Sequence, residues 1–182
     1  MLSENNSLKQ IIDHRLQKLG KIKDAGINPF PYRYSASHSI ADILVNQDKL
    51  LDTNVSISGR IISFRKMGKS SFIHIQDESN KLQIYAKNDI LLDGIYDNIV
   101  RNLDLGDIIG IGGNLFITKM GELTIKASCL EILSKNIRPL PNLKEKDGEL
   151  FYAYEDKELR YRHRHLDLIA NPEVMNVFKL RA

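Results

Sequence analysis

The spacing of apolar residues divides the chain into helical and alternating segments. Over residues 8–23, apolar residues recur at helical spacing with charged residues between them, which predicts an amphipathic helix. Residues 28–32 contain two prolines and predict an extended connection. A second, shorter helix is expected over residues 39–47, with Ser39 or Ser37 as its N-cap.

From residue 55 the period changes from helical to alternating. Ile61 and Ile62 break strict alternation in the first strand, which indicates a bulge that bends it. Three strands, one helix and two strands are expected in that order. This is the order of the OB-fold, a five-stranded Greek-key barrel that binds oligonucleotides through strands two and three and loops one-two and four-five. The expected segments are strands at 55–66, 70–77, 81–85, 107–118 and 122–133, a helix at 90–103, and turns at 67–69 and 119–121.

Alternation also predicts which side chains of the second and third strands share a face. Exposed aromatic rings stack on unpaired bases, and a side-chain amide offers both a donor and an acceptor to a base edge. Arg65, at the end of the first strand, and Glu122, at the start of the fifth, are predicted to reach the same surface. Ile73, Ile75, Leu82 and Ile84 are expected in the core, and Phe72, His74, Gln83 and Tyr85 on the opposite face.

Each of these polar or aromatic residues taken alone has a simpler explanation. A phenylalanine in a strand more often belongs to the core, and a lone glutamine, arginine or glutamate to a solvated face. The shared register favours a binding surface, because burying the aliphatic side chains turns Phe72 and Gln83 outward together. Further candidates for RNA contact are His74, Tyr85 and Lys69.

The chain after the barrel is expected to begin another structural unit. Residues 134–148 show no period and predict a linker, a helix is expected over 154–169, and Pro172 suits the first turn of a further helix. Three parts are expected: a helical extension at 1–54, the barrel at 55–134, and a linker with the incomplete start of a further domain at 135–182.

Other reactive residues have structural interpretations. His163 and His165 do not predict a zinc site, because residues two apart on a helix face different directions and no further ligand is evident. The basic run at 160–165 is interpreted as a salt-bridged helix between domains. Cys129 is expected to be a packed thiol, and the glycines at 110, 112 and 113 are expected to permit close packing of barrel strands.

Composition restricts the remaining classes of function. A net charge of +3 over 182 residues permits nucleic-acid binding by a local surface without indicating a bulk polycation. A single cysteine excludes an internal disulfide, no apolar run approaches the ~20 residues that cross a bilayer, and no secretory signal is visible. These three observations predict a cytoplasmic protein without a membrane partner. No nucleophile–base–acid constellation is evident.

Several motifs together resemble the class II lysyl-tRNA synthetases over nearly the whole chain. The most specific is the segment from Arg160 to Ile169 with the following Asn171-Pro172-Glu173-Val174. The others are Gly26-Ile27-Asn28-Pro29-Phe30-Pro31, Met67-Gly68-Lys69, Ser71-Phe72, Leu82-Gln83-Ile84-Tyr85, and Thr118-Lys119-Met120-Gly121-Glu122-Leu123.

The resemblance implies roles for the outward residues. Phe72 would stack on an anticodon base, and Gln83 with Arg65 would read the central uridine. Glu122 would contact a flanking base. The parent enzyme would be a homodimeric ligase that uses ATP and Mg²⁺ to attach lysine to tRNA(Lys), with its catalytic residues beyond Ala182.

This chain is therefore expected to bind the tRNA(Lys) anticodon loop with no catalytic site, metal site or cofactor of its own. Two alternatives stay open. One is a free-standing OB-fold protein that binds single-stranded nucleic acid. The other is an aspartyl or asparaginyl relative, because those enzymes share the barrel and the reading of a central uridine.

Overall fold

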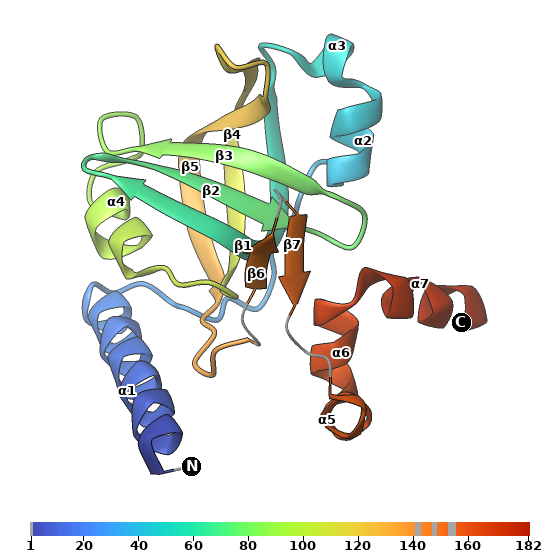
Figure 1. Ribbon diagram of the computed structural model, residues 1–182. Helices are drawn as coiled ribbons and strands as arrows, with labels where there is room; N and C mark the ends of the chain where they lie inside the picture. The colour runs from blue at the N-terminus through green and yellow to red at the C-terminus, as the bar shows by residue number, and fades with distance from the viewer. Residues whose placement is uncertain (1, 141–142, 147–148, 153–155) are drawn as a thin grey trace. The chain divides into compact units, whose positions relative to one another are not determined.

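The structure is a computed structural model that describes residues 2–140, 143–146, 149–152 and 156–182. It divides into two compact units, residues 1–138 and 139–182, which are described separately. The first unit contains the helices α1 (Leu2–Asp24), α2 (Ile40–Val45) and α3 (Gln47–Leu50), and a barrel (Figure 1).

Five strands close into the barrel. Their order is β1-β2-β3-β5-β4, and every neighbouring pair is antiparallel except β3 and β5, which are parallel. This closed Greek-key arrangement confirms the predicted mainly β fold with flanking helices, and it leaves no unpaired sheet edge. The strands are β1 (Asn54–Met67), β2 (Ser70–Gln76), β3 (Lys81–Lys87), β4 (Ile108–Ile117) and β5 (Leu123–Ser134).

Alternation along the strands fills the barrel with aliphatic side chains. Ile73, Ile75 and Ile84 are fully buried, as predicted. The pairing of β1 with β2 shifts register between Ile61 and Ser63, which confirms the predicted bulge. Through this bulge both Ile61 and the residue after it are buried.

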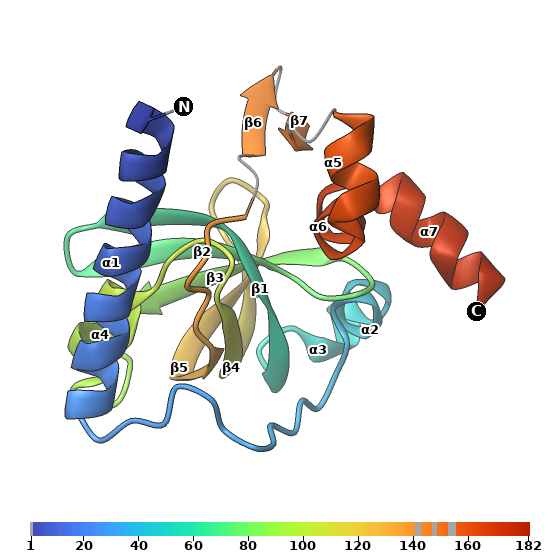
Figure 2. The same cartoon turned by 90° about the horizontal axis from the view of Figure 1, so that it is seen from below.

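The N-terminal helix begins earlier than predicted and packs on the barrel unit through Ile22, which is fully buried. It lies beside α4 (Ile95–Asn98) in both ribbon views (Figures 1 and 2). The α1 side chains also bind across the unit: Arg15 donates to the carbonyl of Asn136 at 2.9 Å.

Two predicted helices are shorter in the structure. The prediction over 90–103 is wrong in extent: only α4 and the 3₁₀ turn η1 (Val100–Asn102) form there. Gly94 has a φ of +79°, so the backbone turns just before α4, and Leu92 is exposed to solvent. In the segment predicted at 39–47, Ser39 is the N-cap of a capping box and the helix is interrupted at Asn46.

Close packing of β4 and β5 confirms the role predicted for Gly112 and Gly113. A Cβ at Gly113 would lie 2.2 Å from the carbonyl oxygen of Lys126, and one at Gly112 would lie 2.6 Å from Cys129 Sγ. Gly110 differs, because a Cβ there would lie 2.5 Å from the ring of Tyr34, which is outside the barrel strands. The prediction of a packed thiol at Cys129 is wrong, because Cys129 is exposed. The register shift in β4–β5 occurs beside Cys129 and turns it out of the barrel.

The second unit differs from its prediction in two places. Residues 143–146 were expected in a linker but form β6 (Leu143–Lys146), antiparallel to β7 (Glu149–Tyr152). The helix expected over 154–169 is two helices, α5 (Lys157–Arg162) and α6 (Arg164–Ala170), and its first two residues lie outside the described residues.

The break between α5 and α6 lies at His163, and Asp167 joins the two helices across it. The fully buried Asp167 carboxylate accepts from Arg160 at 2.7 Å, from Asn171 at 2.6 Å and from Arg164. The salt bridges predicted for this basic run are therefore present.

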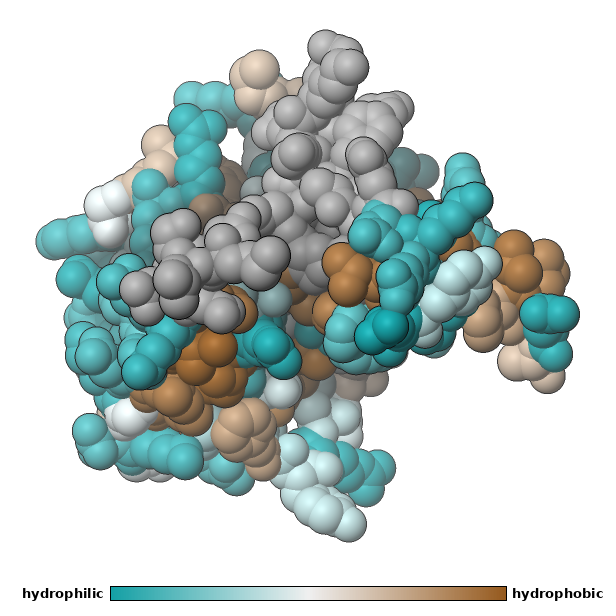
Figure 3. Space-filling view, turned by 60° about the horizontal axis from the view of Figure 1, so that its bottom comes forward, coloured by the Kyte–Doolittle hydropathy of each residue, from teal (hydrophilic) through white to brown (hydrophobic). Residues whose placement is uncertain are grey.

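The last helix, α7 (Pro172–Arg181), begins at the predicted proline. It has exposed apolar side chains at Val177, Phe178 and Leu180. Brown apolar residues accordingly gather at the right of Figure 3, where α7 lies.

Candidate nucleic-acid interface

An aromatic pair occupies the outer face of β2 and β3. Phe72 pairs with Tyr85 across these strands, and the two ring centroids lie 5.0 Å apart with the rings tilted by 40°. Both residues are partly exposed. On the other side of Phe72, β1 places the exposed Arg65 directly opposite it. Ring surface and a guanidinium are thus presented together, as contacts with bases and phosphates require.

A chain of four hydrogen-bonded side chains lies beside the aromatic pair. His74 Nε2 and Glu122 Oε1 are 3.0 Å apart. The Gln83 amide donates through Nε2 to Glu122 Oε2 at 2.6 Å. Thr124 Oγ1 donates to Gln83 Oε1 at 2.8 Å. Residues from β2, β3, β5 and the turn before β5 are therefore joined in one network.

The orientation of the Gln83 amide follows from these partners. An ionised carboxylate only accepts hydrogen bonds, so the amide NH₂ group faces Glu122 and the amide oxygen faces the Thr124 hydroxyl. Each end of the amide uses one of its two hydrogen-bonding positions in this way. One hydrogen and one lone pair stay available to a ligand.

Gln83 is much less exposed than predicted. Its exposed fraction is 9%, although it lies on the outward side of the alternation. The cause is the parallel pairing of β3 with β5, which sets Thr124 opposite Gln83 and brings Glu122 over it. The predicted exposure of Gln83 is therefore wrong, while its position next to His74 agrees with the predicted register.

Glu122 lies in the turn that precedes β5, where Gly121 has a φ of +84°. Its backbone N–H donates to Thr118 Oγ1 at 3.0 Å, which holds the turn. Its side chain is 47% exposed, so the carboxylate is open to solvent while it binds His74 and Gln83.

Most of the predicted residues come together, and we name this surface the recognition face. Lys69 is not among the residues joined there: it lies in the β1–β2 turn, exposed, and lines a separate cavity. The recognition face consists of Arg65, Phe72, His74, Gln83, Tyr85 and Glu122.

Thr124 is the residue that the sequence analysis missed. It is fully buried and holds the carbonyl end of Gln83. No signal along the chain identifies it, because the hydrophobic period of two separate strands does not specify their parallel pairing.

Within the described residues, neither a metal site nor a membrane span is found. No group of three or more histidine, cysteine, aspartate or glutamate side chains is placed to hold a metal ion. None of the described helices is both long and apolar enough to cross a membrane.

Comparison with known proteins agrees with the barrel. Residues 55–133 match the family model described as the OB-fold nucleic acid binding domain. The chain is also 43% identical to a lysine–tRNA ligase of Carboxydothermus hydrogenoformans over 179 residues, which cover 98% of this chain and 35% of that protein.

Two further relatives give the same result. The lysine–tRNA ligase of Pelotomaculum thermopropionicum is 42% identical over 96% of this chain and 33% of its own length. That of Thermosipho africanus is 37% identical over 96% of this chain and 34% of its own length. The chain thus spans about a third of the length of the curated relatives it matches.

Proposed function

We propose that this chain, whose barrel matches the OB-fold nucleic-acid-binding domains and whose sequence resembles lysine–tRNA ligases over nearly its full length, binds the anticodon loop of tRNA(Lys). The observation that carries the proposal is the recognition face, where the Phe72–Tyr85 ring pair lies beside an oriented amide. Stacking supplies affinity for an unpaired base, and the amide supplies a choice between bases.

The amide orientation accounts for selection of a uridine. Uracil presents a carbonyl acceptor beside an N–H donor, whereas cytosine presents an amino donor beside a nitrogen acceptor. In one orientation, the free hydrogen and free lone pair of the Gln83 amide complement the donor–acceptor order of only one of these two bases. Because Glu122 and Thr124 hold one amide orientation, the bases are distinguished by hydrogen bonding. Arg65 would add a contact to the same base or its phosphate.

The relatives support a proposal for the whole protein. We infer that the chain forms the anticodon-binding part of a cytoplasmic, homodimeric ligase that attaches lysine to tRNA with ATP and Mg²⁺. Residues 135–182 would begin the catalytic domain, and the exposed apolar residues of α7 would suit a subunit contact.

Substitution of the two principal residues tests the proposal. We expect Phe72→Ala and Gln83→Ala each to weaken binding of a tRNA(Lys) anticodon stem-loop by about tenfold or more, because a stacked base contributes ~1–3 kcal/mol. Titration at fixed salt measures the affinity, and circular dichroism checks that the barrel stays folded. Gln47→Ala, at an exposed residue of α3, is the matched control.

Other outcomes identify the alternatives. Unchanged affinity of both variants would contradict the assigned roles. Equal affinity for any unpaired RNA would indicate a general single-strand binder. Tighter binding of tRNA(Asp) or tRNA(Asn) stem-loops, which share the central uridine, would indicate an aspartyl or asparaginyl relative.

A further inference from the structure

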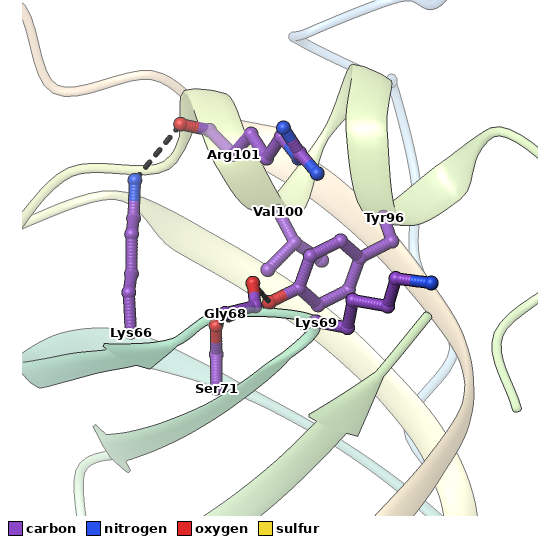
Figure 4. Close-up of a pocket in the computed structure, with 7 residues that line it drawn as sticks. All are labelled: Lys66, Gly68, Lys69, Ser71, Tyr96, Val100 and Arg101. Carbon is purple, nitrogen blue, oxygen red and sulfur yellow. Dashed lines mark hydrogen bonds between the residues drawn. The ribbon is translucent and has the colours of Figure 1, made fainter. Parts of the chain in front are cut away.

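A cavity of about 580 Å³ lies between the β1–β2 turn and the helical segment that joins β3 to β4. Tyr96 and Val100 from the helical segment line it together with three cationic side chains. Figure 4 shows Lys66, Lys69 and Arg101 arranged around the Tyr96 ring. The cationic groups come from both walls, two from the strand and turn and one from η1.

Hydrogen bonds tie the two walls of the cavity together. The hydroxyl groups of Tyr96 and Ser71 are 2.9 Å apart, and the Tyr96 hydroxyl also donates to the carbonyl of Gly68 at 3.4 Å. Lys66 Nζ donates to the carbonyl of Arg101 at 2.9 Å (Figure 4). The cavity is therefore preformed, which lowers the conformational cost of binding.

The cationic groups exceed the carboxylates available to them. Arg101 pairs with Asp97 at 2.7 Å, and Lys69 has no ion pair among the described residues. Near Lys66, the Asp104 carboxylate is already bound by Lys18 and Lys135. Burial lowers the pKa of Lys66, and the neighbouring cations lower it further. The side chains around the cavity thus leave an excess of positive charge.

We propose that this cavity binds a phosphate group carried by a nucleotide. Ammonium groups and an arginine fork from different elements suit a multiply charged, tetrahedral anion, and the ring and isopropyl groups of Tyr96 and Val100 suit the attached sugar. Two sources share this chemistry, the backbone of a bound RNA and a free nucleotide.

The neighbouring recognition face favours the RNA backbone, a choice that rests on the proposed function. Lys66 follows Arg65 in β1 and pairs with Ser71, the residue before Phe72. Because neighbouring strand residues point to opposite faces, an RNA strand stacked on Phe72 would have to bend around the β1–β2 turn to bring a phosphate to the cavity. The cavity then adds affinity without reading sequence.

The salt dependence of RNA binding tests the proposal in the full chain. We expect the double variant Lys69→Gln/Arg101→Gln to bind the tRNA(Lys) stem-loop about tenfold more weakly at low salt, because charge-assisted hydrogen bonds to phosphate are lost. The slope of log affinity against log salt should fall by about one, with the preference for a central uridine unchanged. The control Lys23→Gln/Lys49→Gln removes the same charge at exposed residues outside the cavity and should keep the slope.

Titration with uridine monophosphate distinguishes the two sources. The cavity would be assigned to a free nucleotide by two results together. The nucleotide would shift the Lys69 and Arg101 amide resonances saturably in the unaltered chain but not in the double variant, and the salt slope of RNA binding would be the same in both. An unchanged slope without such shifts would overturn the proposal. If the unaltered chain shows no preference for the stem-loop while the nucleotide still shifts these resonances, the anticodon function fails and the phosphate site stands.

Discussion

The Gln83 amide lies between a buried hydroxyl and an exposed carboxylate. Glu122 is the more exposed partner. Under the proposed function a base would be able to draw Glu122 toward itself, while Thr124 would continue to hold the amide oxygen. Thr124 would then be a positioning residue, because it would act on the base through Gln83. Preorganised hydrogen-bonding groups favour one ligand pattern over another.

We expect Thr124→Val to weaken binding of the central-uridine stem-loop about fivefold and to reduce its preference over a central cytidine. The substitution keeps the shape of the side chain but removes the donor to Gln83, a loss of about 1 kcal/mol. Titration of both stem-loops measures the effect. Thr124→Ser keeps the hydroxyl and should restore the preference. A valine variant with unaltered preference would refute the positioning role.

At the scale of elements, the β2–β3 loop caps the N-terminus of α2. Asp77 accepts from the Ile40 N–H at 2.8 Å, and Ser79 Oγ accepts from the Ala41 N–H at 3.1 Å. Burial raises the pKa of Asp77, but hydrogen bonds from Ser79 and from backbone N–H groups outweigh it, so the pKa lies below its ordinary value. The loop and the helix are thus joined by a carboxylate that must stay ionised.

This lowered pKa makes the cap dependent on pH. A carboxyl whose pKa is lower in the folded state stabilises the fold above its ordinary pKa of about 3.9, and this contribution is lost as the pH falls through the folded pKa. We expect Asp77→Asn to lower the free energy of unfolding by about 1–2 kcal/mol at neutral pH, with the difference shrinking in acid. Urea denaturation at several pH values measures it. Asp48→Asn, at an exposed residue, is the control, and a difference independent of pH would contradict the argument.

At the scale of the barrel unit, a buried lysine joins three distant segments. The side chain of Lys135 is fully buried, and its ammonium lies 2.5 Å from Asp104 and 2.8 Å from Asp107. Asp104 also binds Lys18 of α1 at 2.5 Å. These ion pairs connect the end of β5 to the segment before β4 and to the N-terminal helix.

Loss of this lysine should destabilise the whole unit. We expect Lys135→Met to lower the free energy of unfolding by about 3–5 kcal/mol, because the buried Asp107 carboxylate is left without a cation and Asp104 keeps only Lys18. Adding Asp107→Asn to the same chain should recover part of the loss, because it removes the carboxylate that Lys135→Met leaves without its cation. Urea denaturation of both variants provides the measurement. Equal stability of the single and double variants would show that lost packing, rather than the unpaired charge, causes the destabilisation by Lys135→Met.

Local periodicity determined much of the fold. The strands of the barrel, the inward aliphatic residues and the bulge at Ile62 follow from alternation within single segments. The same periodicity failed at residues 90–103, where the backbone turns at Gly94. It also failed at β6, a four-residue strand that pairs with β7 in a segment without a hydrophobic period. The prediction of one helix at 154–169 was wrong because the chain breaks at His163, and Arg160 and Arg164 on the two sides of this break both donate to Asp167.

The sequence by itself therefore determined the barrel and the side on which Phe72 and Gln83 lie. Only the tertiary structure decided that Gln83 is nearly buried, that Thr124 orients it, and that three cationic side chains surround one cavity. The physical reason is distance along the chain. Gln83 and Glu122 are 39 residues apart, and they meet because a parallel pairing of β3 with β5 closes the barrel. A hydrophobic period reports the environment of one strand, whereas pairing depends on the packing of all five.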